Sequence, residues 1–204
     1  MDYSKVQVSE FLKEVASRKI SPGGGSASAL AAALGSALNL MVINFGIAPF
    51  RSKDELEELE QAKKRQELAM ERALHLMNED CVVFSDLMTA INKKNDTPDK
   101  YSAAAEVPLE VCRSARESLE IAAGVLDIVT GHITADIACS KNILVSSFYS
   151  AKVNVKMNLS GMGPGEMSEK FIRDLKDLEK SVVVLAEEID KKLIKFGIVK
   201  GDSK

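Results

Sequence analysis

Apolar residues recur at a helical spacing along most of the chain, and no segment shows the strict alternation of a half-buried strand. The pattern therefore predicts an all-α protein of about six helices. Turn-forming residues separate the apolar runs, most clearly in NKKNDTPD and SGMGPG. We place the helices over residues 8–18, 26–46, 53–91, 98–130, 134–159 and 166–196, and we expect a disordered tail at 200–204.

The lengths of these helices predict a long-helix bundle. A chain of 204 residues is long enough for one sizeable core, so we expect a single domain over residues 1–204. Some helices exceed the thickness of such a domain, which favours a helical homodimer that shares its core. Pro108 lies inside the fourth helix and is expected to kink it, because proline removes a backbone hydrogen bond.

The second helix differs from the others because residues 27–45 carry no charge. A segment of this length is sufficient to span a bilayer. Polar or small residues nevertheless interrupt it at Ser28, Gly35, Ser36, Asn39 and Asn44. This composition favours a buried helix at a tight interface between helices or subunits.

The overall composition argues against several classes of function. A net charge of −3 predicts no basic face for nucleic acid, and 5% aromatic residues without tryptophan make a base-stacking surface improbable. Cys81, Cys112 and Cys139 are odd in number and lie in apolar helical patterns, which predicts reduced core thiols of a cytoplasmic protein. His75 and His132 have no second His or Cys at ligand spacing, so no metal site is predicted.

A glycine-rich turn precedes the uncharged helix. Gly23, Gly24 and Gly25 follow a proline and lead to Ser26. This order places free backbone N–H groups and the Ser26 hydroxyl at the positive end of a helix dipole, where a carboxylate, a phosphate or a polarised carbonyl can bind. The alternative is a tight turn in which Ser26 is an ordinary N-cap.

Three carboxylates could carry chemistry. Asp136 opens a helix that is mostly small and apolar, so it is either a partly desolvated acid/base group or a residue that stabilises the helix N-terminus. Asp80 precedes an apolar turn and is either a supporting carboxylate or a charge at the core margin. Glu106 lies two residues before Pro108, where a kink frees backbone carbonyls that need a partner, but it could equally be a surface acid.

Two amides and two basic residues complete the set. Asn154 and Asn158 are four residues apart and share one helix face, so they either bond to a neighbouring helix or to a heterocycle that has both donors and acceptors. Arg51 and Lys53 follow the second helix and are either a solvated surface pair or a site for an acidic group.

Four segments carry a resemblance to a known family. PGGGSASALAAALGSALNLMV, EDCVVF, EVPLE and KVNVKMNL, in this order, resemble the motifs of the formiminotetrahydrofolate cyclodeaminase and methenyltetrahydrofolate cyclohydrolase family. The order and spacing agree from about residue 4 to residue 195, which is nearly the whole chain.

The resemblance implies a homodimeric α-helical enzyme that acts on a tetrahydrofolate with a one-carbon unit on N5. In cyclodeamination, N10 attacks the formimino carbon and ammonia leaves, which gives 5,10-methenyltetrahydrofolate. In the cyclohydrolase reaction, water attacks the same carbon of the methenyl compound. Neither reaction demands a metal or redox cofactor, so no cofactor is expected beyond the tetrahydrofolate substrate.

The resemblance also implies roles for individual residues. Asp136 would be the acid/base group, Asp80 a supporting carboxylate, and the turn at residues 23–26 the substrate cradle. The further substrate-binding residues that we predict are Lys53, Glu106 and Asn154.

Two departures from the family pattern keep other functions open. Ala135 stands where the family has serine before the aspartate, and GIAPFRSK retains only part of the family's basic cluster. A folate-binding protein without catalysis is therefore an alternative to the enzyme. The second helix, which resembles an interface, leaves a purely structural helical dimer as another alternative.

Overall fold

The computed structural model describes residues 2–94 and 97–197, and within these residues the chain forms six α-helices, two short 3-10 turns and no strand. The prediction of an all-α protein with six helices is confirmed. The elements are η1 (Tyr3–Lys5), α1 (Val8–Val15), α2 (Gly24–Gly46), α3 (Lys53–Asn92), α4 (Pro98–Val125), η2 (His132–Thr134), α5 (Ala135–Met162) and α6 (Glu166–Lys195). The predicted tail at 200–204 lies outside the described residues.

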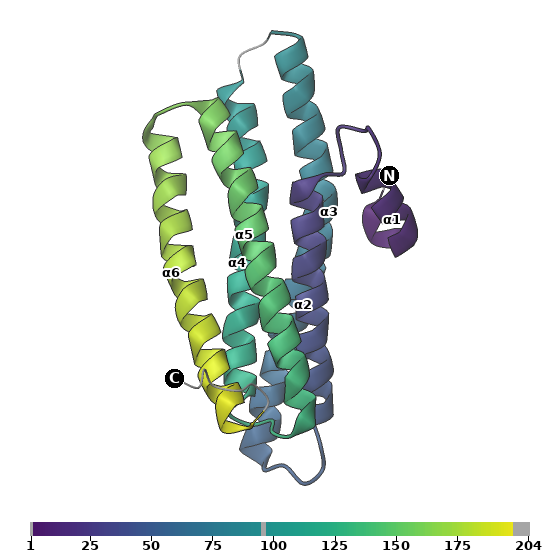
Figure 1. Ribbon diagram of the computed structural model, residues 1–204, viewed down its shortest axis with the longest axis vertical. Coiled ribbons are helices and arrows are strands. Elements are labelled where there is room, and N and C mark those ends of the chain that lie inside the picture. The colour runs from purple at the N-terminus through teal and green to yellow at the C-terminus, as the bar shows by residue number, and fades with distance from the viewer. Residues whose placement is uncertain (1, 95–96, 198–204) are drawn as a thin grey trace.

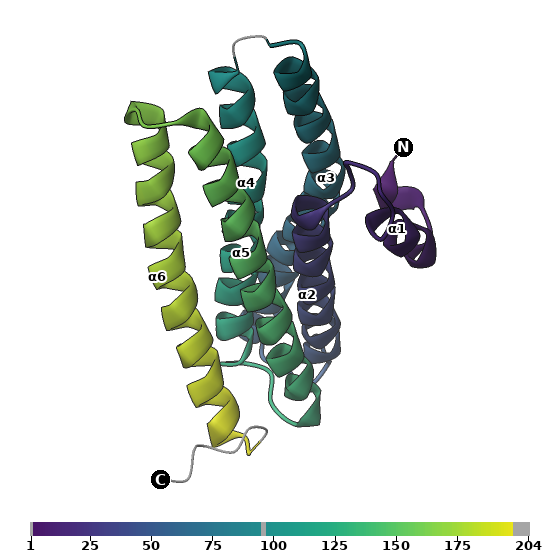
Figure 2. The same cartoon turned by 45° about the horizontal axis from the view of Figure 1, so that its top comes forward.

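Four of the helices form an antiparallel bundle. α2, α3, α4 and α5 run up and down in turn, because short connections join each helix to the next (Figures 1 and 2). α6 packs along the outer side of α4 and α5. α1 stands beside the bundle, near the N-terminal end of α2, while η1 contacts α3.

Three helices, α1, α4 and α5, end at other residues than the apolar pattern predicts. α4 ends at Val125, five residues before the predicted end. The apolar pattern continues beyond it because Leu126 and Val129 pack into the core from the following turn. α5 runs on to Met162 and ends at Gly163, whose φ of 81° suits glycine. α1 ends at Val15, and of its predicted apolar face only Phe11 is buried.

Small residues let α2 pack closely against its neighbours. A Cβ on Gly35 would lie 2.6 Å from Leu144 of α5, so the two helices approach too closely there for a side chain. Of the described helices, α2 alone is long and apolar enough to cross a bilayer, yet 61% of its most apolar window is buried within the bundle. This burial agrees with the interpretation of α2 as a core helix.

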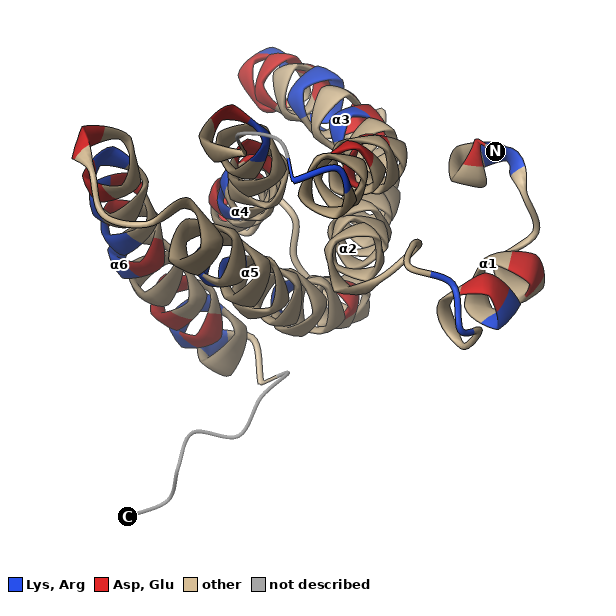
Figure 3. Cartoon of the chain, turned by 90° about the horizontal axis from the view of Figure 1, so that it is seen from above, with Lys and Arg blue, Asp and Glu red and all other residues tan. Residues whose placement is uncertain are grey.

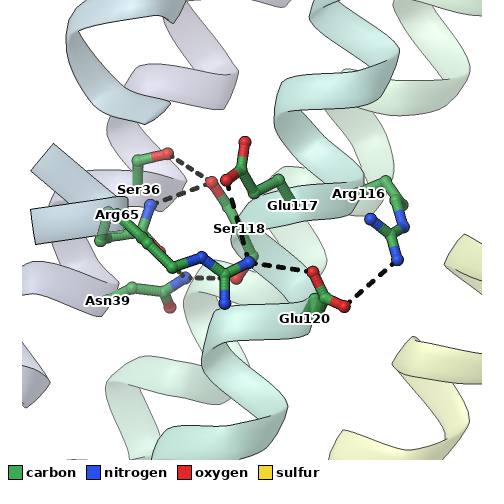
Figure 4. Close-up of polar contacts among 8 residues, drawn as sticks. Ser36, Asn39, Arg65, Arg116, Glu117, Ser118 and Glu120 are labelled. Atoms are coloured by element: carbon green, nitrogen blue, oxygen red, sulfur yellow. Dashed lines mark hydrogen bonds and ion pairs between the residues drawn. The ribbon is translucent and has the colours of Figure 1, made fainter. Parts of the chain in front are cut away.

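A buried polar network joins α2, α3 and α4 (Figure 4). Asn39 donates to the Ser118 carbonyl at 2.9 Å and to Gln66 Oε1 at 3.2 Å, while Gln66 donates to the Ser118 hydroxyl at 2.9 Å. The Ser36 hydroxyl also bonds to that of Ser118, at 2.8 Å. All four side chains are fully buried, so the network fixes the register of the three helices.

The cysteines are free thiols with different surroundings. Cys112 is buried, as expected, and Cys81 is half-buried. The prediction of a core thiol is wrong for Cys139, which is exposed near the start of α5, because the outer face of that helix is itself rich in small and apolar residues.

Candidate functional site

One pocket brings together segments that are far apart in the sequence. It lies between the N-terminal end of α2, the C-terminal halves of α3 and α5, and the N-terminal part of α4, and its cavity volume is about 170 Å³. We call it the Asp80 pocket. Its lining residues are Ile20, Ser21, Gly23, Gly24, Gly25, Asp80, Val83, Phe84, Ala104, Asn154, Met157 and Asn158. The structure therefore brings the three glycines, Asp80 and Asn154 together, as a common site requires.

The start of α2 holds the carboxylate of Asp80. α2 begins at Gly24 with Gly23 as its N-cap, so Ser26 is not the cap that one interpretation of the sequence made it. Ser26 lies in the first turn, fully buried, and donates its backbone N–H and its hydroxyl to Asp80 Oδ2, each at 2.8 Å. The anion at the positive end of this helix is thus a side chain of the protein itself.

Only one of the three glycines is required by a close approach. A Cβ on Gly25 would lie 1.9 Å from Asp80 Oδ1, a distance that no real contact allows. A Cβ on Gly24 would meet Asn154 at an ordinary 3.4 Å, and one on Gly23 would meet no atom within 4 Å. Within one chain, the run of three glycines therefore meets a steric need only at Gly25.

Burial sets the proton affinity of Asp80. It raises the pKa of the carboxyl above its ordinary value of 3.8, although the two hydrogen bonds from Ser26 act in the opposite direction. Burial also raises the pKa of the neighbouring Cys81 thiol, whose Sγ lies 3.2 Å from the Ser26 hydroxyl. A carboxyl that holds its proton more tightly than usual, and whose Oδ1 takes no bond from Ser26, is suited to acid/base chemistry.

Two amides from α5 complete the polar lining. Asn158 Nδ2 donates to the Ala104 carbonyl at 2.6 Å, and Asn154 Nδ2 donates to the Ser150 carbonyl at 3.0 Å. A carbonyl oxygen only accepts, so these bonds fix which end of each amide is turned toward the protein. Both Oδ1 atoms remain as acceptors. Of the two amides, only Asn154 was named as a substrate-binding residue. The bond from Asn158 to Ala104 of α4 is the contact with a neighbouring helix that was one of the two interpretations of the pair.

Asp136 and Lys53 lie at the opposite end of the bundle from the Asp80 pocket. Asp136 is in the first turn of α5, eighteen residues before Asn154, which corresponds to about 27 Å along the helix. Lys53 opens α3, twenty-seven residues before Asp80, or about 40 Å away. Within one chain, the structure does not bring either residue to Asp80.

Glu106 also lies outside the pocket. Its carboxylate accepts a hydrogen bond from Arg113 at 2.7 Å, on an exposed part of α4, and Arg113 pairs with Glu110 and Asp174 as well. Glu106 is thus part of a surface ion-pair cluster in this structure. Among the described residues, no three His, Cys, Asp or Glu side chains lie close enough together to hold a metal ion.

Comparisons with known proteins agree on one family. The family model described as formiminotransferase-cyclodeaminase matches residues 7–177. The chain is 26% identical over 193 residues to methenyltetrahydrofolate cyclohydrolase of Methylorubrum extorquens, which covers 89% of this chain and 93% of that protein. A crystal structure of formiminotetrahydrofolate cyclodeaminase from Thermotoga maritima superposes with a TM-score of 0.90 at 24% identity, covering 95% of this chain and 98% of the other.

These findings confirm the resemblance seen in the sequence, because the family model spans most of the chain and the fold agrees over almost all of it. The family consists of folate-converting enzymes. The chain belongs to the formiminotransferase-cyclodeaminase family.

Proposed function

We propose that this protein is a folate one-carbon enzyme that converts 5-formiminotetrahydrofolate to 5,10-methenyltetrahydrofolate and ammonia. The observation that carries the proposal is the partly buried carboxyl of Asp80, held at the start of α2 in a pocket whose other lining residues are amides, glycines, Ser21 and apolar side chains. The name of the structural relative supports the same reaction.

Asp80 would move one proton in this reaction. N10 of the substrate attacks the carbon of the formimino group, whose imino nitrogen is protonated; this forms the C–N bond and leaves a positive charge on N10. The Asp80 carboxylate takes the proton from N10 and gives it to the former imino nitrogen, which then leaves as ammonia. The amidinium cation that remains is stabilised by the acceptors of the pocket, namely Asp80 Oδ1 and Asn154 Oδ1.

A cyclohydrolase reaction is the second candidate, because the curated relative bears that name. In this case Asp80 would take a proton from a water molecule that attacks the same amidinium carbon. The absorbance of 5,10-methenyltetrahydrofolate distinguishes the reactions: it rises when the formimino substrate is cyclised and falls when the methenyl compound is hydrolysed.

Both assays should be run with wild type and with Asp80→Asn. If wild type turns over either substrate and Asp80→Asn does not, the protein is an enzyme with Asp80 as its acid/base group. Binding of tetrahydrofolate without turnover would indicate a folate-binding protein, and no binding at all would leave a structural helical dimer.

We also propose a homodimer that forms through α2 and α5. α2 carries no charged residue, and two of the four charged residues of α5, Lys141 and Lys152, pair with α6. Charged residues are frequent along α1, α3, α4 and α6, while α2 and most of α5 have none (Figure 3). Large apolar side chains are exposed on this uncharged face, at Leu34, Phe45, Tyr149, Val153 and Met157.

The size of this face suits a stable interface. α2 has 23 residues and is therefore about 34 Å long. Two adjacent helices present a strip about 20 Å wide, so the face covers about 700 Å² on each protomer, close to the roughly 800 Å² per partner of a standard stable interface. A second copy of the chain offers the same uncharged surface by symmetry.

An antiparallel two-fold arrangement of this dimer would give Asp136 a role. Asp136 and the Asp80 pocket lie at opposite ends of the α2–α5 face, so the two-fold axis would bring Asp136 of the partner subunit toward this pocket. The cavity of about 170 Å³ supports the idea, since ligand sites commonly have 300–1,000 Å³ and one chain encloses less than that.

Mixed dimers test this arrangement. Asp80→Asn and Asp136→Asn are each expected to be inactive as homodimers. When the two are unfolded together and refolded, half of the dimers contain one pocket with both carboxylates intact, so activity should return to about a quarter of wild type. Absence of any recovery, with mixed dimers shown by mass spectrometry, would refute a contribution from the partner.

A further inference from the structure

Pro108 lies in the middle of α4, is buried, and does not end the helix. Proline has no backbone N–H, so the helical hydrogen bond to the carbonyl of Ala104, four residues earlier, cannot form. The proline ring also crowds this carbonyl and tilts it away from the helix axis. Ala104 is buried, and a buried carbonyl needs a donor from elsewhere.

Asn158 supplies that donor from the neighbouring helix. Its Nδ2 lies 2.6 Å from the Ala104 carbonyl oxygen, and both residues line the Asp80 pocket. Because the carbonyl accepts and cannot donate, the amide can have only one orientation, with Nδ2 toward α4. The remaining polar atom, Oδ1, is left for a group inside the pocket.

We propose that Pro108 is a positioning residue that acts through Asn158. By freeing the Ala104 carbonyl, it turns the Asn158 amide so that Oδ1 accepts a hydrogen bond from a ring N–H of the ligand. This inference rests on the proposed function, in which the pocket takes the N–H-bearing ring of a tetrahydrofolate. A cavity of about 170 Å³ is of the size that holds one ring system, since an engineered cavity of about 150 Å³ binds benzene.

Pro108→Ala restores the missing N–H and lets the Ala104 carbonyl return to the helix. Asn158 then loses its partner, and the affinity for tetrahydrofolate, measured by calorimetry, should fall about five- to tenfold, as expected for one neutral hydrogen bond. The unfolding temperature should stay close to that of wild type, because the regained helical bond offsets the lost ring contacts. Pro98→Ala is the matched control, since Pro98 is the first residue of the same helix and frees no carbonyl of α4.

A double-mutant cycle separates this role from general damage to α4. Asn158→Ala alone should weaken binding by about the same factor as Pro108→Ala, and the double variant should be no weaker than Asn158→Ala. Losses that multiply in the double variant would overturn the proposal, because the proline would then act independently of Asn158. Wild-type affinity in either single variant would overturn it as well.

A measurement without ligand keeps this inference distinct from the proposed function. The side-chain amide resonance of Asn158, assigned by its loss in Asn158→Asp, should exchange slowly in wild type and in Pro98→Ala, and faster in Pro108→Ala. If wild type binds no tetrahydrofolate, the proposed function fails. Exchange that is the same in all three proteins would show that Pro108 does not position Asn158.

Discussion

Gly25→Ala is the substitution for which the structure gives the sharpest expectation. The new Cβ would lie 1.9 Å from Asp80 Oδ1, whereas ordinary contacts begin at about 3.4 Å, so the carboxylate has to move by about 1.5 Å. A shift of this size breaks the two 2.8 Å bonds from Ser26 to Asp80. Hydrogen bonds to a charged group contribute about 1.5–3 kcal/mol each, and water will replace part of this.

We therefore expect Gly25→Ala to lose about 2–4 kcal/mol of unfolding free energy, which lowers the unfolding temperature by about 5–15 °C for a chain of this size. Turnover should fall at least about 100-fold, because the acid/base group is displaced. Urea unfolding followed by circular dichroism gives the first quantity, and the methenyltetrahydrofolate absorbance assay gives the second.

Two other glycines serve as controls. Gly124→Ala meets no atom within 4 Å and lies away from the pocket, so both quantities should stay near wild type. Gly35→Ala meets Leu144 at 2.6 Å in the core and should lower stability while the folded protein keeps its turnover. If Gly25→Ala behaves like Gly35→Ala, with lower stability but normal turnover, the placement of Asp80 at the reacting atoms is refuted.

Three further predictions concern the pKa of Asp80, the core and the interface. Because the folded-state pKa of Asp80 is raised, wild type should lose stability relative to Asp80→Asn as pH rises from about 3.8 through that pKa, and urea unfolding of both proteins at several pH values measures the difference; a constant difference would contradict the shift. Asn39→Ala should cost about 1–3 kcal/mol in urea unfolding, because it leaves the buried Gln66 Oε1 without its donor and the Ser118 carbonyl with only its helical bond, and a cost below about 1 kcal/mol would show that the network is dispensable. Leu34→Glu should give a monomer by light scattering, while Val184→Glu on α6 should leave a dimer; equal masses would exclude the α2–α5 interface.

The helices could be predicted because their apolar periodicity extends over many turns. Both ends of α3 and of α6 lie within one residue of the predicted positions. A capping box of Ser52 and Glu55 marks the start of α3, and SGMGPG marks the start of α6. The end of α4 could not be predicted in the same way. Leu126 and Val129 fill the core from a turn, and periodicity records burial rather than backbone conformation.

The glycines show a limit of the same kind at the site. Three consecutive glycines indicate that another part of the chain approaches the backbone closely, but the sequence does not show at which glycine this happens. Only the position of Asp80, which belongs to another helix fifty-five residues later, singles out Gly25. The sequence also predicted that Pro108 frees a backbone carbonyl, but it did not show that Asn158 is the donor to this carbonyl. A glutamate such as Glu106 offers only acceptors when ionised, and the structure provides an amide donor from α5 instead.

The separation of Asp136 from Asn154, in contrast, was already contained in the sequence, whereas the place of Asp80 beside Asn154 is known only from the structure. Asp136 and Asn154 lie on one predicted helix, and eighteen residues of α-helix span about 27 Å, which no single small-molecule site bridges by direct contact. Eighteen residues are also five full turns, so both side chains lie on the same face of that helix. Two residues on one face of a helix can be too far apart to meet within a chain. An antiparallel two-fold dimer can bring Asp136 of one subunit near Asn154 of the other. The mixed-dimer experiment therefore tests the one geometry in which Asp136 and Asp80 can act on the same substrate.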